Sequence, residues 1–358
     1  MQGAGGLHVR PRFLLSKDFY SPMKNPARFI LSAAIAALVV APLVTHAAEP
    51  KKVIVVTVTT GYRHSSIATA EKTLQQLGDE SKAFTIVDFA RQPEVQVLKK
   101  PSKPNDLKAD ADEKAKANYE KELKRYSDEI AKWTPEMDAK VKSSNDEYNA
   151  QLKASLAKVS PENLQAKHID GVIFANTTGD LPLPDKEGFI KWIEDGHAFM
   201  AMHSGSDTFH GFPGYLDMLQ GEFETHKAQS PADLIAADTD HPANGGIGAT
   251  WDIKQEEMYH IKHQDRSKVR ALWYMKHDPN EVTKLKFFPV SWVRNAGKGR
   301  VFYTSLGHRE DLWDASENLK DRVNSVDVSK KYQAHILGGI KWALGVAEGS
   351  SEPNPNVQ

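Results

Sequence analysis

The sequence contains no cysteine among its 358 residues. This absence excludes disulfide bonds, metal sites built from thiolates, and any mechanism with a cysteine nucleophile. An excess of one charge sign is also missing, because 46 Lys and Arg face 47 Asp and Glu, for a formal net charge of −1. No overall field therefore favours nucleic acid or an anionic membrane, and we expect no nucleic-acid partner.

The N-terminal segment 23–47 has the layout of a secretory signal peptide. A basic start after Met23, an apolar run over 29–44 and small residues before a cleavage site at Ala48 follow in order. The run is shorter than the roughly 20 residues that a membrane-spanning helix needs. We expect export to the periplasm or beyond, with no stable membrane insertion of the mature protein. Residues 1–22 are patternless and are expected to be disordered or to precede the true start.

Apolar, β-branched runs alternate with segments of helical spacing through much of the chain. This alternation is typical of an α/β protein with a three-layer, doubly wound and mostly parallel sheet. We expect one domain over 51–346, with sites beyond the carboxyl ends of its strands. The first expected strands are 53–59, 84–89, 172–175 and 198–202, with helices over 68–77 and 186–194.

The second half of the domain also contains strand candidates. We expect strands 253–260 and 269–275 to pair with each other. Gly297-Lys298-Gly299 predicts a tight hairpin between strands 287–294 and 299–305. A further strand is expected over 233–237 and a closing helix over 333–344, and the tail 347–358 is expected to be disordered.

The segment 92–165 interrupts the alternation. It is dense in Lys, Glu, Asp and Ala, and it predicts two helices, over 110–132 and 135–159. Charge runs at helical spacing usually mark solvent-exposed faces. We therefore expect a solvated helical hairpin inserted in the domain, with few apolar residues to add to the core.

Three histidines each follow a predicted strand. His64 comes after the first strand, His203 after 198–202, and His308 after 299–305. Parallel strands deliver their carboxyl ends to one edge of a sheet, so these imidazoles are expected to meet there. Gathered imidazoles suit a divalent transition metal or proton transfer, whereas a lone histidine is more often a hydrogen-bonded structural residue.

A short motif at residues 201–205 is a more specific signal than the spacing of the histidines. Ala201-Met202-His203-Ser204-Gly205 places small residues on either side of a sharp strand-to-helix turn, the form of a nucleophile elbow. The residue at its apex is His203. A serine nucleophile at Ser204 is disfavoured, because Met202 would then have to fill a small-residue position. The plain alternative is an ordinary turn containing a glycine.

An ordered set of motifs resembles the ThuA-like (trehalose utilisation) family along residues 52–345. The most distinctive block is Gly299-Arg300-Val301-Phe302-Tyr303-Thr304-Ser305-Leu306-Gly307-His308. The other motifs are Gly61-Tyr62-Arg63-His64, Phe174-Ala175-Asn176-Thr177-Thr178-Gly179-Asp180, Met202-His203-Ser204-Gly205-Ser206-Asp207, Gly221-Glu222-Phe223-Glu224-Thr225-His226, Glu256-Glu257-Met258-Tyr259 and Gly338-Gly339-Ile340-Lys341-Trp342-Ala343.

The resemblance implies a fold similar to class I glutamine amidotransferases without their cysteine, and a link to trehalose and related keto-glycosides. It also implies a set of site residues. The catalytic candidates are His203, Glu257, Asp207 and His64, the metal-ligand candidates are His203, His226 and His308, and Tyr259 is a substrate-binding candidate. Tyr62 and Trp313 are further substrate-binding candidates, as aromatic surfaces on which a sugar could stack.

The sequence departs from the family at two points. The insertion is longer than the family core needs, and Lys227 stands where relatives often carry proline, which puts the local geometry of His226 in doubt. Trp292 could also offer an aromatic face to a sugar, although its place in an expected strand favours core packing.

Two functions remain open from the sequence. One is an exported enzyme, a hydrolase, lyase or isomerase acting on a small-molecule carbohydrate such as a glycoside or keto-sugar, with zinc or manganese as a candidate cofactor. The other is a non-catalytic sugar-binding or accessory protein. Glutamine amidotransfer is excluded because it needs a thiolate. The sequence leaves open whether the chain forms a homo-oligomer.

Overall fold

The computed structural model describes residues 49–357. The predicted signal peptide over 23–47 and the segment 1–22 lie outside these described residues. Within residues 49–357, no helix is both long and apolar enough to cross a membrane.

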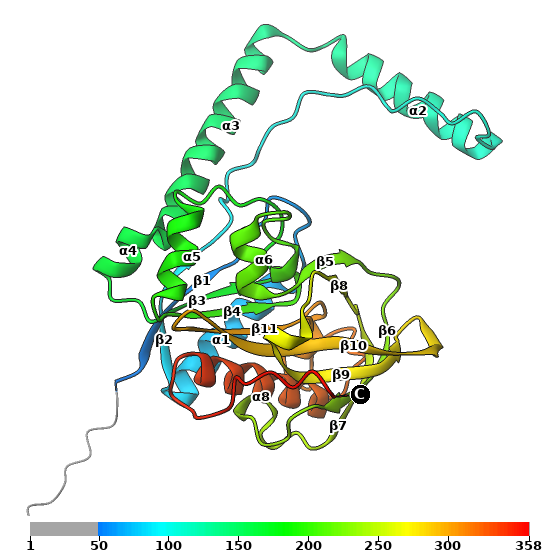
Figure 1. The fold of residues 1–358 in the computed structure, drawn as a ribbon. Helices are drawn as coiled ribbons and strands as arrows, with labels where there is room; N and C mark the ends of the chain where they lie inside the picture. The colour runs from blue at the N-terminus through cyan, green and yellow to red at the C-terminus, as the bar shows by residue number, and fades with distance from the viewer. Residues whose placement is uncertain (1–48, 358) are drawn as a thin grey trace, which may run out of the picture. The chain divides into compact units, whose positions relative to one another are not determined.

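A nine-stranded sheet forms the centre of the domain (Figure 1). Its strand order is β2-β1-β3-β4-β11-β10-β9-β6-β7. The strands β2, β1, β3, β4 and β11 run parallel, which confirms the predicted α/β architecture for this half of the sheet. These strands are β1 (Lys51–Val56), β2 (Phe84–Ala90), β3 (Gly171–Ala175), β4 (Ala198–Met202) and β11 (Gly299–Thr304). Every residue of β3 and β4 is buried, as their continuous apolar runs predicted.

The other half of the sheet is antiparallel. The predicted hairpin is confirmed, because β10 pairs antiparallel with β11 from Ser291–Thr304 to Ala296–Gly299. The predicted pairing of 253–260 with 269–275 is wrong, because β6 lies between β7 and β9 and pairs with both. The strands are β10 (Glu281–Ala296), β9 (Arg270–Asp278), β6 (Ser230–Ala236) and β7 (Thr250–Glu256), and a separate two-stranded sheet joins β5 (Glu222–Thr225) to β8 (His260–Lys262).

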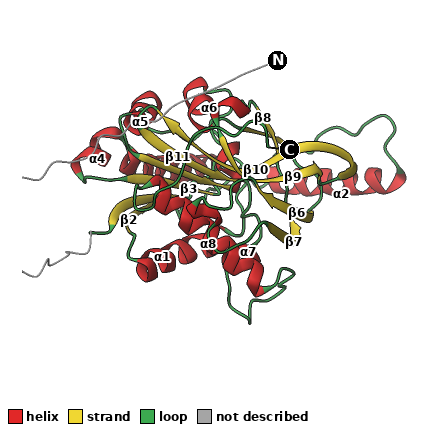
Figure 2. Cartoon of the chain, turned by 60° about the horizontal axis from the view of Figure 1, so that its bottom comes forward, coloured by secondary structure: helices red, strands yellow, loops and turns green. Residues whose placement is uncertain are grey.

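Helices cover both faces of the sheet (Figure 2). One core cluster packs α1 and α8 against the sheet, and a second packs α5 and α6 against the opposite face. The first face carries α1 (Ile67–Ser81), α7 (Glu310–Trp313) and α8 (Val326–Ala343), and the second carries α4 (Pro161–Ala166), α5 (Lys186–Glu194) and α6 (Pro213–Leu219). Short 3₁₀ turns are η1 (Ala157–Val159), η2 (His203–Asp207), η3 (Pro242–Asn244) and η4 (Arg266–Lys268). The likeness to class I glutamine amidotransferases stays a prediction.

The insertion forms two consecutive helices, α2 (Glu113–Ile130) and α3 (Pro135–Leu156). The Asp112 side chain caps α2, and Thr134 caps α3 just before Pro135 at the first helical position. No residue of α2 is buried. The end of α3 differs from the expectation, because Leu152 and Leu156 belong to the core. Only the first part of the insertion is therefore a solvated segment.

The C-terminal residues, expected to be disordered, make specific contacts in the structure. The Gly349 carbonyl accepts a hydrogen bond from Trp342 Nε1 at 2.9 Å. The Asn354 side chain exchanges two hydrogen bonds with the backbone of Ala271 on β9, at 2.7 and 3.1 Å. These paired hydrogen bonds hold Asn354 opposite Ala271, and the composition of the tail gave no sign that it would be ordered in this way.

We expect removal of residues 99–143 to leave a cooperatively folding domain. The backbone N–H of Leu98 donates to Ser144 Oγ at 3.1 Å, so a short Gly-Ser linker can join these two positions without stretching the core. A longer deletion of 95–157 should lower the free energy of unfolding strongly, because losing each buried leucine costs about 2–5 kcal/mol. Thermal unfolding by circular dichroism compares the two; loss of a cooperative transition in the shorter deletion would contradict the expectation.

Candidate functional site

His203 occupies a strained turn directly after β4. Its φ is +48°, in the left-handed region that few non-glycine residues adopt. A Cβ added to Gly205 would lie 2.7 Å from the Cβ of Ala201, so the turn needs both small residues. The predicted elbow is therefore present, with His203 at its apex, and such strain is typical of functional sites.

The ring of His203 is fully buried and held in one orientation. Its Nδ1 lies 2.8 Å from the carbonyl oxygen of Ser305 and donates to it, because a carbonyl can only accept. In the neutral imidazole, Nε2 then carries the lone pair. Burial, more than any contact, lowers the pKa of His203 and favours this neutral form.

The structure brings His64 and His308 to His203, as expected for residues that follow the carboxyl ends of parallel strands. The ring centroids of His64 and His203 are 4.7 Å apart, and each lies 5.3 Å from that of His308. The two Nε2 atoms of His64 and His203 are 3.2 Å apart, and His64 Nδ1 lies 3.3 Å from Ser204 Oγ. Burial, followed by the neighbouring histidines, lowers the pKa of His64 to about 3, so its ring is neutral at pH 7.

Glu257 reaches the same point from the antiparallel half of the sheet, just after β7. Its Oε2 lies 3.1 Å from His308 Nδ1 and 3.6 Å from His203 Nε2, and its Oε1 lies 3.1 Å from His226 Nδ1. Burial alone would raise the pKa of Glu257, but the contacts with His203 and His308 outweigh it and hold the pKa well below its ordinary value. Glu257 is therefore the anionic centre of the cluster.

The donor atoms of this cluster suit a divalent transition metal. One atom each from His64, His203, Glu257 and His308 lies within 4.8 Å of all the others. The Nε2 atoms of His64 and His203 face each other, so they share one proton in a hydrogen bond or, if Ser204 accepts from His64 Nδ1, present two lone pairs to a cation. His308 Nδ1 is buried and has no well-aligned hydrogen-bond partner in the described part of the chain. Three imidazoles and one carboxylate are ligands that zinc and manganese accept.

His226 does not join this donor set, although the sequence placed it among the metal ligands. Its side chain is 44% exposed, and its Nδ1 also lies 2.9 Å from the carbonyl oxygen of Lys227. It touches only the outer oxygen of Glu257. The structure thus places His226 beside the cluster and puts His64 inside it.

Glu256 fixes the loop that carries His308. Its buried Oε1 accepts hydrogen bonds from the backbone N–H groups of Gly307, at 2.9 Å, and His308, at 2.7 Å. Burial raises the pKa of Glu256 to about 7, against the opposing effects of His308 and these two N–H groups. This role was not predicted from the sequence, in which the acidic pair Glu256-Glu257 within the expected strand 253–260 was the only signal.

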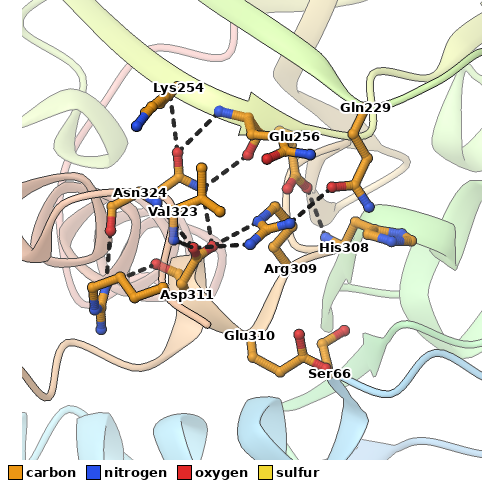
Figure 3. A network of polar contacts seen from close by, with 12 residues as sticks. Ser66, Gln229, Lys254, Glu256, His308, Arg309, Glu310, Asp311, Val323 and Asn324 are labelled. Carbon is orange, nitrogen blue, oxygen red and sulfur yellow. Dashed lines mark hydrogen bonds and ion pairs between the residues drawn. The ribbon is translucent and has the colours of Figure 1, made fainter. Parts of the chain in front are cut away.

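A second set of contacts reinforces the same loop (Figure 3). Arg309 Nη1 donates to Gln229 at 2.9 Å, and both other guanidinium contacts go to the Asp311 carboxylate. Asp311 in turn accepts from the backbone of Asn324, whose side-chain oxygen accepts from Lys254 on β7. The loop after β11 is therefore held to β7 by two independent bridges.

Trp313, expected to offer a stacking face to a sugar, cannot do so because its side chain is fully buried. Its Nε1 donates to the carbonyl oxygen of Gly307 at 2.8 Å. The same oxygen accepts from Asn176 at 2.9 Å and from Ser66 at 3.2 Å. Trp313 thus supports the His308 loop from within the core. Trp292 is likewise buried, and it donates to the Leu219 carbonyl.

A pocket of about 370 Å³ opens over the cluster. Tyr62 is 68% exposed at its mouth, and Tyr259 packs with its ring centroid 4.3 Å from that of His203. Asp207, from η2, also lines the pocket. The pocket thus combines aromatic surface with titratable groups. Its lining residues are Tyr62, His64, Asp207, Phe223, His226, Glu257, Tyr259 and His308.

Comparisons with known proteins agree with this geometry at the level of fold and family. The chain resembles a putative ThuA-like protein from Parabacteroides merdae, with 14% identity, a TM-score of 0.52 and coverage of 86% of this chain and 96% of the other. The chain also resembles a putative ThuA-like protein from Bacteroides uniformis, with 14% identity, a TM-score of 0.51 and coverage of 87% of this chain and 97% of the other. No curated protein matches the chain significantly. The sequence profile of the ThuA family, described as trehalose utilisation, matches residues 52–343, and the chain therefore belongs to the ThuA family.

Proposed function

We propose that the pocket above His203 is the active site of an enzyme that acts on a glycoside or keto-sugar. One observation carries the proposal: His64, His203, Glu257 and His308 converge at a single point, where all but the buried His203 line a pocket. They come from four segments distant in sequence, and two of them are buried imidazoles with lowered pKa values. Groups of this kind gathered in one cleft are the usual mark of an active site.

The proposal also includes a divalent metal, zinc or manganese, held by His64, His203, Glu257 and His308. When bound, such an ion would act as a Lewis acid toward a sugar oxygen or lower the pKa of a bound water. The chain itself contributes the orientation of the ligands. Ser305 fixes the ring of His203 through Nδ1, and Glu256 fixes the backbone of His308, as outer partners of metal ligands commonly do.

The metal proposal predicts which histidines matter. Purified chain freed of metal should take up one equivalent of zinc or manganese, measured by calorimetry and elemental analysis. His64→Ala, His203→Asn and His308→Ala should each weaken binding by at least about 10–100-fold, the loss known for outer-shell partners alone. Asparagine tolerates the left-handed turn at position 203.

His226→Ala supplies the discriminating variant, because His226 touches only the outer oxygen of Glu257. It should retain binding within a few-fold, and His277→Gln, on β9 outside the pocket, is the control. Equal loss in the His226 and His203 variants would contradict the assigned donor set.

The enzyme proposal is tested with oxidised disaccharides. The wild-type chain should convert keto-trehalose or a related keto-disaccharide, followed by chromatography of the released sugars. His203→Asn should lower turnover by about 10²-fold or more, as expected for loss of a proton-transfer group or of a metal ligand. Its melting temperature should stay close to that of the wild type.

The alternative is a sugar-binding protein without chemistry, which the exposed ring of Tyr62 at the pocket mouth favours. Saturable binding of a disaccharide, lost in Tyr62→Ala but unaccompanied by conversion of any keto-sugar, would replace the enzyme by this alternative.

We further propose that the chain is exported, on the pattern of residues 23–47. Expressed in a bacterium at full length, the mature protein should start near Ala48, and N-terminal sequencing of periplasmic material checks this. Periplasmic protein that begins before Met23 would overturn the assignment.

A further inference from the structure

A second group of titratable residues reaches the pocket through Asp207, separate from the histidine cluster. His210 lies between two carboxylates. Its Nδ1 is 3.0 Å from Glu222 Oε1, and its Nε2 contacts Oδ1 of Asp207, which lines the pocket. No role for His210 or Glu222 was expected from the sequence.

The arrangement requires a proton that the two carboxylates cannot supply when both are ionised. A carboxylate oxygen only accepts hydrogen bonds, so both nitrogens of His210 must donate, or Asp207 must itself carry a proton. Either His210 is an imidazolium between two carboxylates, or it is neutral and accepts the O–H of Asp207. In both cases one exchangeable proton lies between His210 and Asp207.

Glu222 is the fixed end of this series of hydrogen-bonded side chains. Its side chain is only 4% exposed, and Lys262 Nζ on β8 lies 2.8 Å from its Oε1. The backbone N–H of Gly211 donates to its Oε2 at 3.2 Å. Burial alone would raise the pKa of Glu222, but these partners hold it well below its ordinary value. Glu222 therefore stays ionised and orients Nδ1–H of His210, which leaves the mobile proton on the Asp207 side.

We propose that Asp207, His210 and Glu222 form a proton relay that delivers a proton to the leaving oxygen of a glycoside bound in the pocket. The inference rests on the proposed function and adds the general acid to it. Asp207 is the group that faces the substrate. His210 and Glu222 are positioning residues that act through Asp207, in the manner of a carboxylate-histidine pair that fixes a tautomer.

The step balances in protons and electrons. The glycosidic C–O bond breaks, both of its electrons go to the leaving oxygen, and this oxygen takes the proton from Asp207. Solvent then protonates Nε2 of His210 through its exposed edge, and His210 passes this proton to Asp207. The sugar fragment then loses a proton from an adjacent carbon, or gains the hydroxide of a water that gives up a proton, and in either case this proton passes to solvent. One proton enters and one leaves in either case.

Leaving-group dependence tests the relay. The probes are a methyl and a dinitrophenyl keto-glucoside, because methoxide needs protonation to depart and dinitrophenolate does not. Asp207→Asn and His210→Gln should lower kcat on the methyl substrate by about 10²–10⁴-fold, the usual contribution of general acid catalysis. On the dinitrophenyl substrate, kcat should fall less than about ten-fold.

Chemical rescue separates a positioning role from a structural one. The side chain of His210 is 41% exposed, so the space left in His210→Gly is open to solvent. Added imidazole should restore kcat on the methyl substrate with little change in KM. A matched control is His277→Gly, since His277 also pairs with an aspartate, Asp233, outside the pocket; it should neither lose activity nor respond to imidazole.

The outcomes are distinct. Equal losses on both substrates in Asp207→Asn, or no rescue of a folded His210→Gly, overturn the relay while the proposed function stands. No conversion of either glycoside by the wild-type chain overturns the proposed function and the relay with it. Retained melting temperatures in the variants exclude misfolding as the cause of a loss.

Discussion

The site depends on one buried carboxylate that accepts two backbone N–H groups. Glu256 ends β7, at the edge of the antiparallel half of the sheet, and holds Gly307 and His308 at the end of β11. A buried acceptor with two aligned donors in a low-dielectric interior is a strong restraint. Because Glu256 is held in this way, the next residue, Glu257, is fixed against His308. The distance between the anionic and imidazole components of the cluster is therefore set by the backbone.

The histidine cluster could be predicted because each member follows an easily recognised strand. Parallel strands bring their carboxyl ends together, so His64, His203 and His308 had to meet once the sheet was parallel. The positive φ of His203 also had a visible signal, in the small residues Ala201 and Gly205. Glu257 was different. It follows the antiparallel strand β7, and only the family resemblance placed it in the site.

The remaining errors arise from contacts between residues far apart in sequence. β7 and β9 were expected to pair because they are near neighbours along the chain, yet β6 lies between them. Trp313 follows the His308 block and looked available to a ligand, but Ser66, Asn176 and Trp313 all share the Gly307 carbonyl, which holds the indole inside the core. No role of His210 could be predicted because its partner Glu222, which Lys262 holds in turn, lies on a separate two-stranded sheet.

The shared carbonyl of Gly307 has a consequence for how a ligand enters. Three donors on one oxygen, with the two N–H bonds to Glu256, leave the loop little freedom to rearrange. A ligand that reaches His308 therefore meets a preorganised surface and loses little conformational entropy in the protein on binding. At this end of the pocket, the protein would bind a ligand without rearranging its backbone. Any adaptation to ligands of different size must come from the side chains at the mouth, where Tyr62 is 68% exposed.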